Sequence, residues 1–159
     1  MDVKPAPGSW QHDLVELLET LAKHEVPFLV VGGFAVAHAG HLRATKDLDL
    51  FIPRAAGIDA RLVCALSEFL GGPVSAKEVA HAFLRFFVGR PGAIDVIRRL
   101  PGVTWATAWK GRSLGLFFGA RVPFIGIEAL IRNKRAVGRR VDLADVEELV
   151  RIRRERGAR

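Results

Sequence analysis

The interpretation of this chain starts from the stretch Asp47-Leu48-Asp49-Leu50-Phe51-Ile52, which places two charged residues in an otherwise apolar run. Strands normally exclude aspartate. Because strand side chains alternate in direction, both carboxylates point to one face of a sheet, with their Cα atoms about 7 Å apart. At about 4 Å, two such charges repel by roughly 4 kcal/mol at an effective dielectric constant of 20. The pair therefore predicts a cation site, and its oxygen ligands suit Mg²⁺ or Mn²⁺.

A glycine turn precedes this pair in the sequence. The apolar run Phe28-Leu29-Val30-Val31 is followed at once by Gly32 and Gly33, and then by helix-compatible residues 34–39. Glycine permits positive φ and close approach of a ligand to the backbone, and the first N–H groups of a helix favour an anion. The sequence predicts a strand, a turn and a helix start that together hold a triphosphate.

A third carboxylate lies in the short β-branched run Ala93-Ile94-Asp95-Val96-Ile97. Each feature alone has another interpretation, because an Asp-x-Asp pair also occurs in turns and helix caps and a single Asp also marks an exposed sheet edge. Their order favours chemistry, since three carboxylates can hold the two metal ions of phosphoryl and nucleotidyl transfer. The preceding segment Arg43-Ala44-Thr45-Lys46 adds donors for phosphate, although ordinary surface polarity explains Lys46 as well.

The block from Val31 to Leu50 resembles the core motif of the DNA polymerase β-like nucleotidyltransferase superfamily. It is most similar to the small bacterial branch with an Arg-x-Thr-x-Asp-x-Asp pattern, which includes abortive-infection and toxin–antitoxin nucleotidyltransferases. The resemblance implies metal ligands at Asp47, Asp49 and Asp95. It also implies a phosphate turn and accessory contacts to the nucleotide or its metal, at Gly32, Gly33, Arg43 and Thr45. Many members have Gly-Ser in place of Gly32-Gly33, so one phosphate-binding hydroxyl is missing here.

The resemblance continues downstream, where residues 127–135 and 139–146 match the Lys and Arg-x-x-Asp ending of that branch. By that likeness Lys134 faces the nucleotide, with Asp142 or Asp145 nearby. Asp142 is open to a second interpretation, as the N-cap of the last helix with Asp145 in its first turn.

Composition and length bound the architecture. The chain has 159 residues, half of them hydrophobic, which predicts one nucleotidyltransferase-like domain over residues 1–159, with a core at about 10–125 and a C-terminal helical part at about 126–156. The apolar runs are too short to span a membrane, and residues 1–9 lack signal-peptide character, so a cytoplasmic location is expected. Cys64 cannot form an internal disulfide and is expected to be buried.

Periodicity and turn residues predict an α/β fold with a small, mixed, twisted sheet flanked by helices. Predicted helices cover residues 10–24, 58–69, 127–137 and 143–154. Predicted strands begin at Pro27 and at Asp47, and two hairpins pair 82–88 with 93–97 across 89–92, and 114–118 with 121–125.

The expected activity is transfer of a nucleoside monophosphate from an NTP to an acceptor hydroxyl, with Mg²⁺ or Mn²⁺ as cofactor and pyrophosphate as product. The acceptor is left open between a tRNA end, a protein side chain and a small molecule such as an aminoglycoside. One alternative is a catalytically idle nucleotide-binding or partner-binding protein, such as half of a toxin–antitoxin pair with a cognate antitoxin. Another is a basic RNA-binding module, because the net charge is +7 and the C-terminal helices are rich in arginine.

Overall fold

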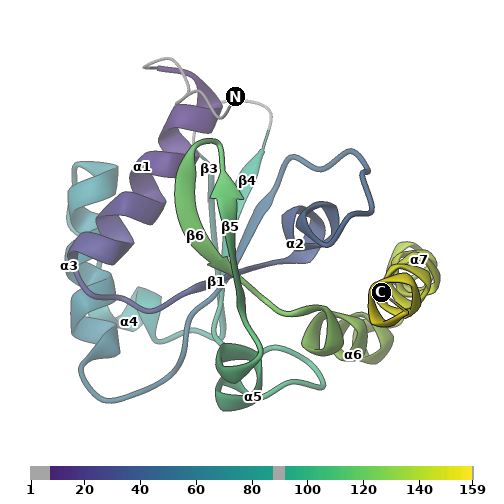
Figure 1. Ribbon diagram of the computed structural model, residues 1–159. Coiled ribbons are helices and arrows are strands. Elements are labelled where there is room, and N and C mark those ends of the chain that lie inside the picture. Colours follow the sequence, from purple (N-terminus) through teal and green to yellow (C-terminus); the bar gives the residue numbers. More distant parts are fainter. Residues whose placement is uncertain (1–7, 88–91, 159) are drawn as a thin grey trace.

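A computed structural model describes residues 8–87 and 92–158, and a six-stranded mixed sheet lies at its centre (Figure 1). The strand order is β3-β4-β2-β1-β6-β5. The strands are β1 (Leu29–Val31), β2 (Leu48–Phe51), β3 (Phe83–Phe87), β4 (Ala93–Ile97), β5 (Ser113–Phe117) and β6 (Ala120–Phe124). The helices are α1 (Trp10–Lys23), α2 (Gly32–His38), α3 (Ile58–Leu70), α4 (Ala76–Val79), α5 (Trp105–Lys110), α6 (Ile127–Val137) and α7 (Arg140–Gly157). The predicted α/β class is confirmed.

Strand pairing in the centre of the sheet brings distant segments together. β1 runs antiparallel to β2 and parallel to β6, and β2 runs parallel to β4. The two hairpins β3–β4 and β5–β6 complete the two sides of the sheet. In the β2–β4 pairing Asp49 lies directly opposite Asp95. A slip of one residue would turn one of these carboxylates to the other face, so the register itself builds the acidic cluster.

Helices cover both faces of the sheet (Figure 1). α1 and α3 pack together on one side, whereas α2, α6 and α7 lie on the other. α1 begins as predicted, because Ser9 accepts a hydrogen bond from the N–H of His12, and its leucines at helical spacing are buried. The strand residues Leu48 and Leu50 are buried on the side of the sheet that α1 and α3 cover. Their alternation with the aspartates leaves the carboxylates on the face shared with α6.

Some sequence predictions need correction. α7 begins at Arg140, so Asp142 lies within its first turn and is not an N-cap, and Asp145 lies beyond that turn. The cap position belongs to Arg139, whose ψ of 156° is extended, and ion pairs occupy the Asp142 carboxylate. Cys64 is exposed, because α3 turns other residues inward.

The short helices α4 and α5 were not predicted, because four to six residues carry little periodicity; Ser75 and Thr104 cap them. The predicted strand end at Val88 and turn residues 89–91 lie outside the described residues. Within residues 8–87 and 92–158, no helix is both long enough and apolar enough to cross a membrane.

Candidate active site

Three carboxylates gather where β2 and β4 run side by side. Asp47 immediately precedes β2, Asp49 lies within it, and Asp95 faces Asp49 from β4 and is 4% exposed. Burial, followed by the charges of Asp95 and Asp47 and a hydrogen bond to Asp95, raises the pKa of Asp49 to about 7. The structure therefore brings all three predicted acids together, and their mutual repulsion favours a cation or a proton among them.

Two of these carboxylates already have partners within the chain. Oδ1 of Asp47 accepts a hydrogen bond of 2.9 Å from the N–H of Ala93. Asp95 accepts two hydrogen bonds of 2.6 Å from Nε and Nη2 of Arg85, which lies opposite it on β3. The hydrogen bonds and charge of Asp95 raise the pKa of Arg85, so the fork stays ionised. Arg85 was not predicted, although the exact register of the β3–β4 hairpin would have identified it.

The Arg85 fork also sets how the acids can meet a cation. Among the described residues, one group of three side chains has its ligand atoms within 4.8 Å of one another, and it consists of His12, Asp13 and Glu16 on α1. The carboxylates of Asp47, Asp49 and Asp95 are not spaced this closely. A carboxylate has about four lone-pair positions, and the fork uses two of them on Asp95. Asp47 and Asp49 therefore offer the accessible oxygens. Asp95 can contribute an oxygen to the cation when a hydrogen bond from Arg85 breaks.

The glycine turn lies against the acids. Gly32 has a φ of +62°, and a Cβ at this position would overlap the carboxylate of Asp49. A Cβ on Gly33 would overlap Oγ1 of Thr45. Both positions therefore need glycine because side chains from β2 and from the segment before it occupy the space. The Thr45 hydroxyl lies where a serine side chain at position 33 would begin.

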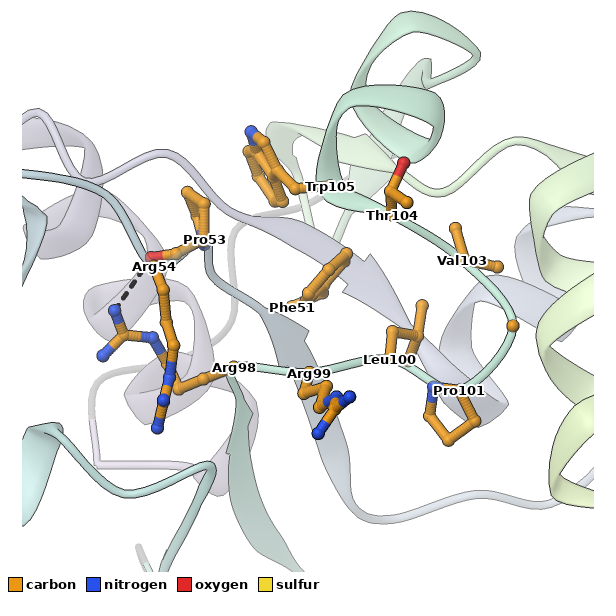
Figure 2. Close-up of a pocket in the computed structure, with 11 residues that line it drawn as sticks. Phe51, Pro53, Arg54, Arg98, Arg99, Leu100, Pro101, Val103, Thr104 and Trp105 are labelled. Atoms are coloured by element: carbon orange, nitrogen blue, oxygen red, sulfur yellow. Dashed lines mark hydrogen bonds between the residues drawn. The ribbon is translucent and has the colours of Figure 1, made fainter.

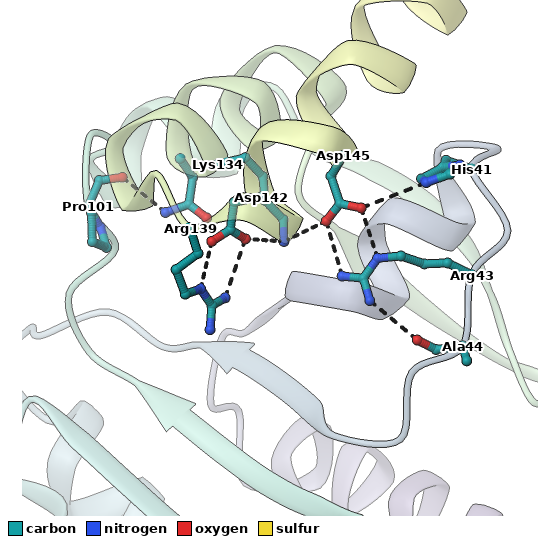
Figure 3. A network of polar contacts seen from close by, with 9 residues as sticks. His41, Arg43, Ala44, Pro101, Lys134, Arg139, Asp142 and Asp145 are labelled. Atoms are coloured by element: carbon teal, nitrogen blue, oxygen red, sulfur yellow. Dashed lines mark hydrogen bonds and ion pairs between the residues drawn. The ribbon is translucent and has the colours of Figure 1, made fainter.

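A network of alternating charges joins α6, α7 and the segment after α2 (Figure 3). Nζ of Lys134, which is 3% exposed, lies 2.7 Å from Oδ1 of Asp142 and 2.9 Å from Oδ2 of Asp145. Arg139 donates to Asp142 at 2.6 Å, and Arg43 forks onto Asp145 at 2.8 and 3.1 Å. Burial alone would raise the pKa of Asp142, but the hydrogen bonds from Arg139 and Lys134 lower it. Three cations thus share two carboxylates.

Part of this network and one of the acids line a small cavity of about 130 Å³. Asp49, Gly32 and Lys134 contribute to its wall, together with Arg139 and Asp142. Its volume is below that of typical ligand sites, so it can enclose part of a nucleotide. Of the other predicted site residues, Arg43 binds Asp145 and Thr45 packs at Gly33. The charge pattern of residues 134–145 was visible in the sequence, but the pairing of Arg43 with Asp145 across 102 positions was not.

No protein-family model matches this chain, and no curated protein sequence matches it significantly. Its fold is similar to that of several solved structures. An antigenic nucleotidyltransferase-like protein from Paracoccidioides brasiliensis has a TM-score of 0.57 and 18% identity over 88% of this chain and 75% of that one. The lincosamide antibiotic adenylyltransferase LnuA, with lincomycin bound, has a TM-score of 0.52 and 15% identity over 88% and 96%. The antibiotic-resistance factor ANT(2'')-Ia has a TM-score of 0.50 and 18% identity over 93% and 92%. The chain therefore has the nucleotidyltransferase fold.

The raised pKa of Asp49 makes stability depend on pH. Between about pH 4 and pH 7 this carboxyl is ionised in the unfolded chain and protonated in the folded one, so rising pH favours unfolding. In metal-free buffer we expect Asp49→Asn to gain stability over the wild type across this range, reaching a plateau of up to about 4 kcal/mol above pH 7. Urea denaturation at pH 4 to 8 measures the difference, with Asp13→Asn as control. A difference that does not change with pH would contradict the assignment.

The close contact between Gly33 and Thr45 predicts that substitutions at the two positions are coupled. Gly33→Ser alone should lower the free energy of unfolding by about 1–3 kcal/mol, because its Cβ overlaps the threonine side chain. Adding Thr45→Ala removes the closest contact, which is to Oγ1, but leaves Cβ of residue 45 at 2.8 Å, so it should recover only part of that loss. A double-mutant cycle by urea denaturation measures the coupling, and additive effects would rule the contact out.

Proposed function

We propose that this protein is a metal-dependent nucleotidyltransferase that transfers a nucleoside monophosphate from an NTP to an acceptor hydroxyl and releases pyrophosphate. The observation that carries the proposal is the placement of Asp49 opposite Asp95 and beside Asp47, against the Gly32 turn. The nucleotidyltransferase fold supports it. Neither the carboxylates nor the turn alone would indicate nucleotidyl transfer.

The donor set fits a hard divalent cation, because it consists of carboxylate oxygens in an electrostatically unfavourable cluster. Asp47, Asp49 and Asp95 would hold Mg²⁺ or Mn²⁺, which supplies positive charge for the phosphates and the attacking oxygen. Asp49 would need to be ionised to hold the cation, so occupancy would depend on pH. Arg85 holds Asp95 in place when the cation is absent.

The phosphates of the NTP have donors on three segments of the chain. The Asp49 carboxylate lies against Gly32 and the Thr45 side chain against Gly33, so the Thr45 hydroxyl takes the place of the serine that this turn lacks. Lys134 lies in the wall beside Asp49, and its charge acts on that carboxyl. Arg43 donates two hydrogen bonds to Asp145 on α7 and so anchors the segment that carries Thr45.

The reaction needs no covalent intermediate on the protein. The acceptor oxygen attacks the α-phosphorus, the bond from that phosphorus to the bridging oxygen breaks, and pyrophosphate leaves. A carboxylate of the cluster accepts the proton of the acceptor hydroxyl. The chain contributes mainly position and charge, which is the main requirement of phosphoryl-type transfer.

A second candidate function is a catalytically idle nucleotide-binding or partner-binding protein of the same fold, such as one member of a toxin–antitoxin pair. The observation in its favour is the double hydrogen bond from Arg85 to Asp95, which gives the third acid an internal cation. In that case Arg85 would replace a metal permanently. The two candidates differ in how nucleotide binding depends on the acids.

Calorimetric titration with each of the four NTPs distinguishes them, with Mg²⁺ and with chelator, on the wild type, Asp47→Ala/Asp49→Ala and the control Glu147→Ala, which changes an exposed acid of α7. We expect at least one NTP to bind only with Mg²⁺, a loss of at least tenfold in affinity in the double variant, and no change in the control. Equal NTP affinity with and without the acids would favour the idle protein. Absence of NTP binding to the wild type would overturn the enzyme and the nucleotide-binding protein and would favour the partner-binding protein.

A further inference from the structure

A second and larger pocket lies on the same face of the sheet as the carboxylates, farther along β2 and β4 (Figure 2). Phe51 follows Asp49 by two residues on β2, so strand alternation puts it on the acid face, and Arg99 lies two residues beyond the end of β4. Leu100 and Pro101 line this pocket and the small acid-side cavity alike. Its volume of about 630 Å³ falls within the range of small-molecule sites.

The wall of this pocket is fixed by contacts to α6. Nδ2 of Asn133 donates a hydrogen bond of 3.0 Å to the carbonyl of Pro101, and Leu100 forms a bridge with Val103. Gly102 has a φ of +72°, and a Cβ at this position would lie 2.8 Å from Cβ of Ala136. The loop therefore packs tightly on the helix that carries Lys134, and the pocket is pre-formed beside the acids.

The charge of the pocket is positive. Three arginines line it, and none of the carboxylate residues within 8–87 and 92–158 does. Arg98 is buried and turned toward Asp59 and three backbone carbonyls, so its charge is already compensated. Arg54 donates to the carbonyl of Ala80. Arg99 is exposed and has no hydrogen-bond or ion-pair partner among the described residues. Two guanidinium groups are thus available to an anion.

Aromatic rings form the other side of the pocket. Trp105 and Phe51 meet edge to face with ring centroids 5.2 Å apart. Trp105 also stacks on Trp109 at 5.1 Å, which fixes its plane. Figure 2 shows Phe51 and Trp105 on the same rim as Pro53, with the arginines below. Guanidinium groups next to aromatic rings suit a ligand that carries both a phosphate and a planar base.

We propose that this pocket binds a nucleotide unit of the acceptor, with its phosphate at Arg54 and Arg99 and its base against Phe51 and Trp105. The inference rests on the proposed function and adds a substrate class to it. The shared wall at Leu100 and Pro101 puts this pocket next to the cavity that Asp49 lines, so a hydroxyl of the bound unit would lie near the acids. Polycationic acceptors such as aminoglycosides are disfavoured, because they would meet uncompensated arginines. The nucleotide unit is either the 3′ end of an RNA or a free mononucleotide.

Equilibrium binding in chelator and without NTP tests the pocket independently of the metal site. The probes are a fluorescein-labelled eight-nucleotide RNA with a free 3′ hydroxyl, AMP as competitor, and the aminoglycoside kanamycin. The proteins are the wild type, Arg99→Glu and Arg54→Gln. Arg121→Glu is the matched control, because Arg121 is an exposed arginine on β6 outside this pocket and the substitution makes the same change in charge.

We expect Arg99→Glu to weaken RNA binding at least tenfold and Arg54→Gln to weaken it three- to tenfold. Arg121→Glu should change it less than threefold, and the affinity for Mg²⁺–NTP should be unchanged in Arg99→Glu. Displacement of the RNA by AMP at similar affinity would support a mononucleotide acceptor, and failure of AMP to displace it would support an RNA end. Kanamycin should not displace the RNA.

Three results would overturn the inference. Equal losses in Arg99→Glu and Arg121→Glu would mean that binding is only a response to net charge. A parallel loss of Mg²⁺–NTP affinity in Arg99→Glu would mean that the pocket binds the NTP. Kanamycin binding that depends on Arg99 would mean that the pocket takes an aminoglycoside and not a nucleotide. Loss of NTP binding in Asp47→Ala/Asp49→Ala tests the proposed function separately. The two hypotheses can therefore fail independently.

Discussion

The repulsion between Asp49 and Asp95 is the constraint on which the rest of this site depends. The two residues are direct neighbours in a parallel ladder, where strands lie about 4.8 Å apart, and Asp47 adds a third charge. The chain contributes to this arrangement at several points. Gly32 leaves room for the carboxylate of Asp49, Arg85 neutralises Asp95, and the pKa of Asp49 rises to about 7. A cluster of this kind is costly to keep without a cation.

The charge network of the C-terminal helices compensates the buried charge of Lys134. A buried lysine such as Lys134 is stable only when its charge is paired, and Asp142 and Asp145 both approach it. The same Asp145 binds Arg43, which ties the segment before β2 to α7. The network therefore links the two halves of the chain around the cleft and positions Lys134 and Thr45 relative to the acids. Folding of the tail and assembly of the site are in this way coupled.

Much of the fold could be predicted from the sequence because its signals are local. The leucines of α1, the glycines after β1 and the apolar run of β2 each specify an element without tertiary information. The three acids could be identified because charge in an apolar strand is unusual. The Arg85–Asp95 and Arg43–Asp145 pairs could not be predicted, because they depend on hairpin register and on contacts between distant segments. Of the two interpretations of Asp142 the N-cap is wrong, and the sequence could not exclude it because capping and ion pairing favour the same residue type.

The central claim is that Asp47, Asp49 and Asp95 form a cation site that positions a nucleotide. A crystal structure with Mn²⁺ and a non-hydrolysable NTP analogue tests it most directly, because manganese is located by its anomalous scattering. We expect manganese bound to oxygens of Asp47 and Asp49, at least one oxygen of Asp95 released from Arg85, and the triphosphate against Gly32, Gly33 and Thr45. Absence of manganese from the carboxylates, with the Arg85–Asp95 hydrogen bonds intact at saturating Mn²⁺ and nucleotide, would contradict it.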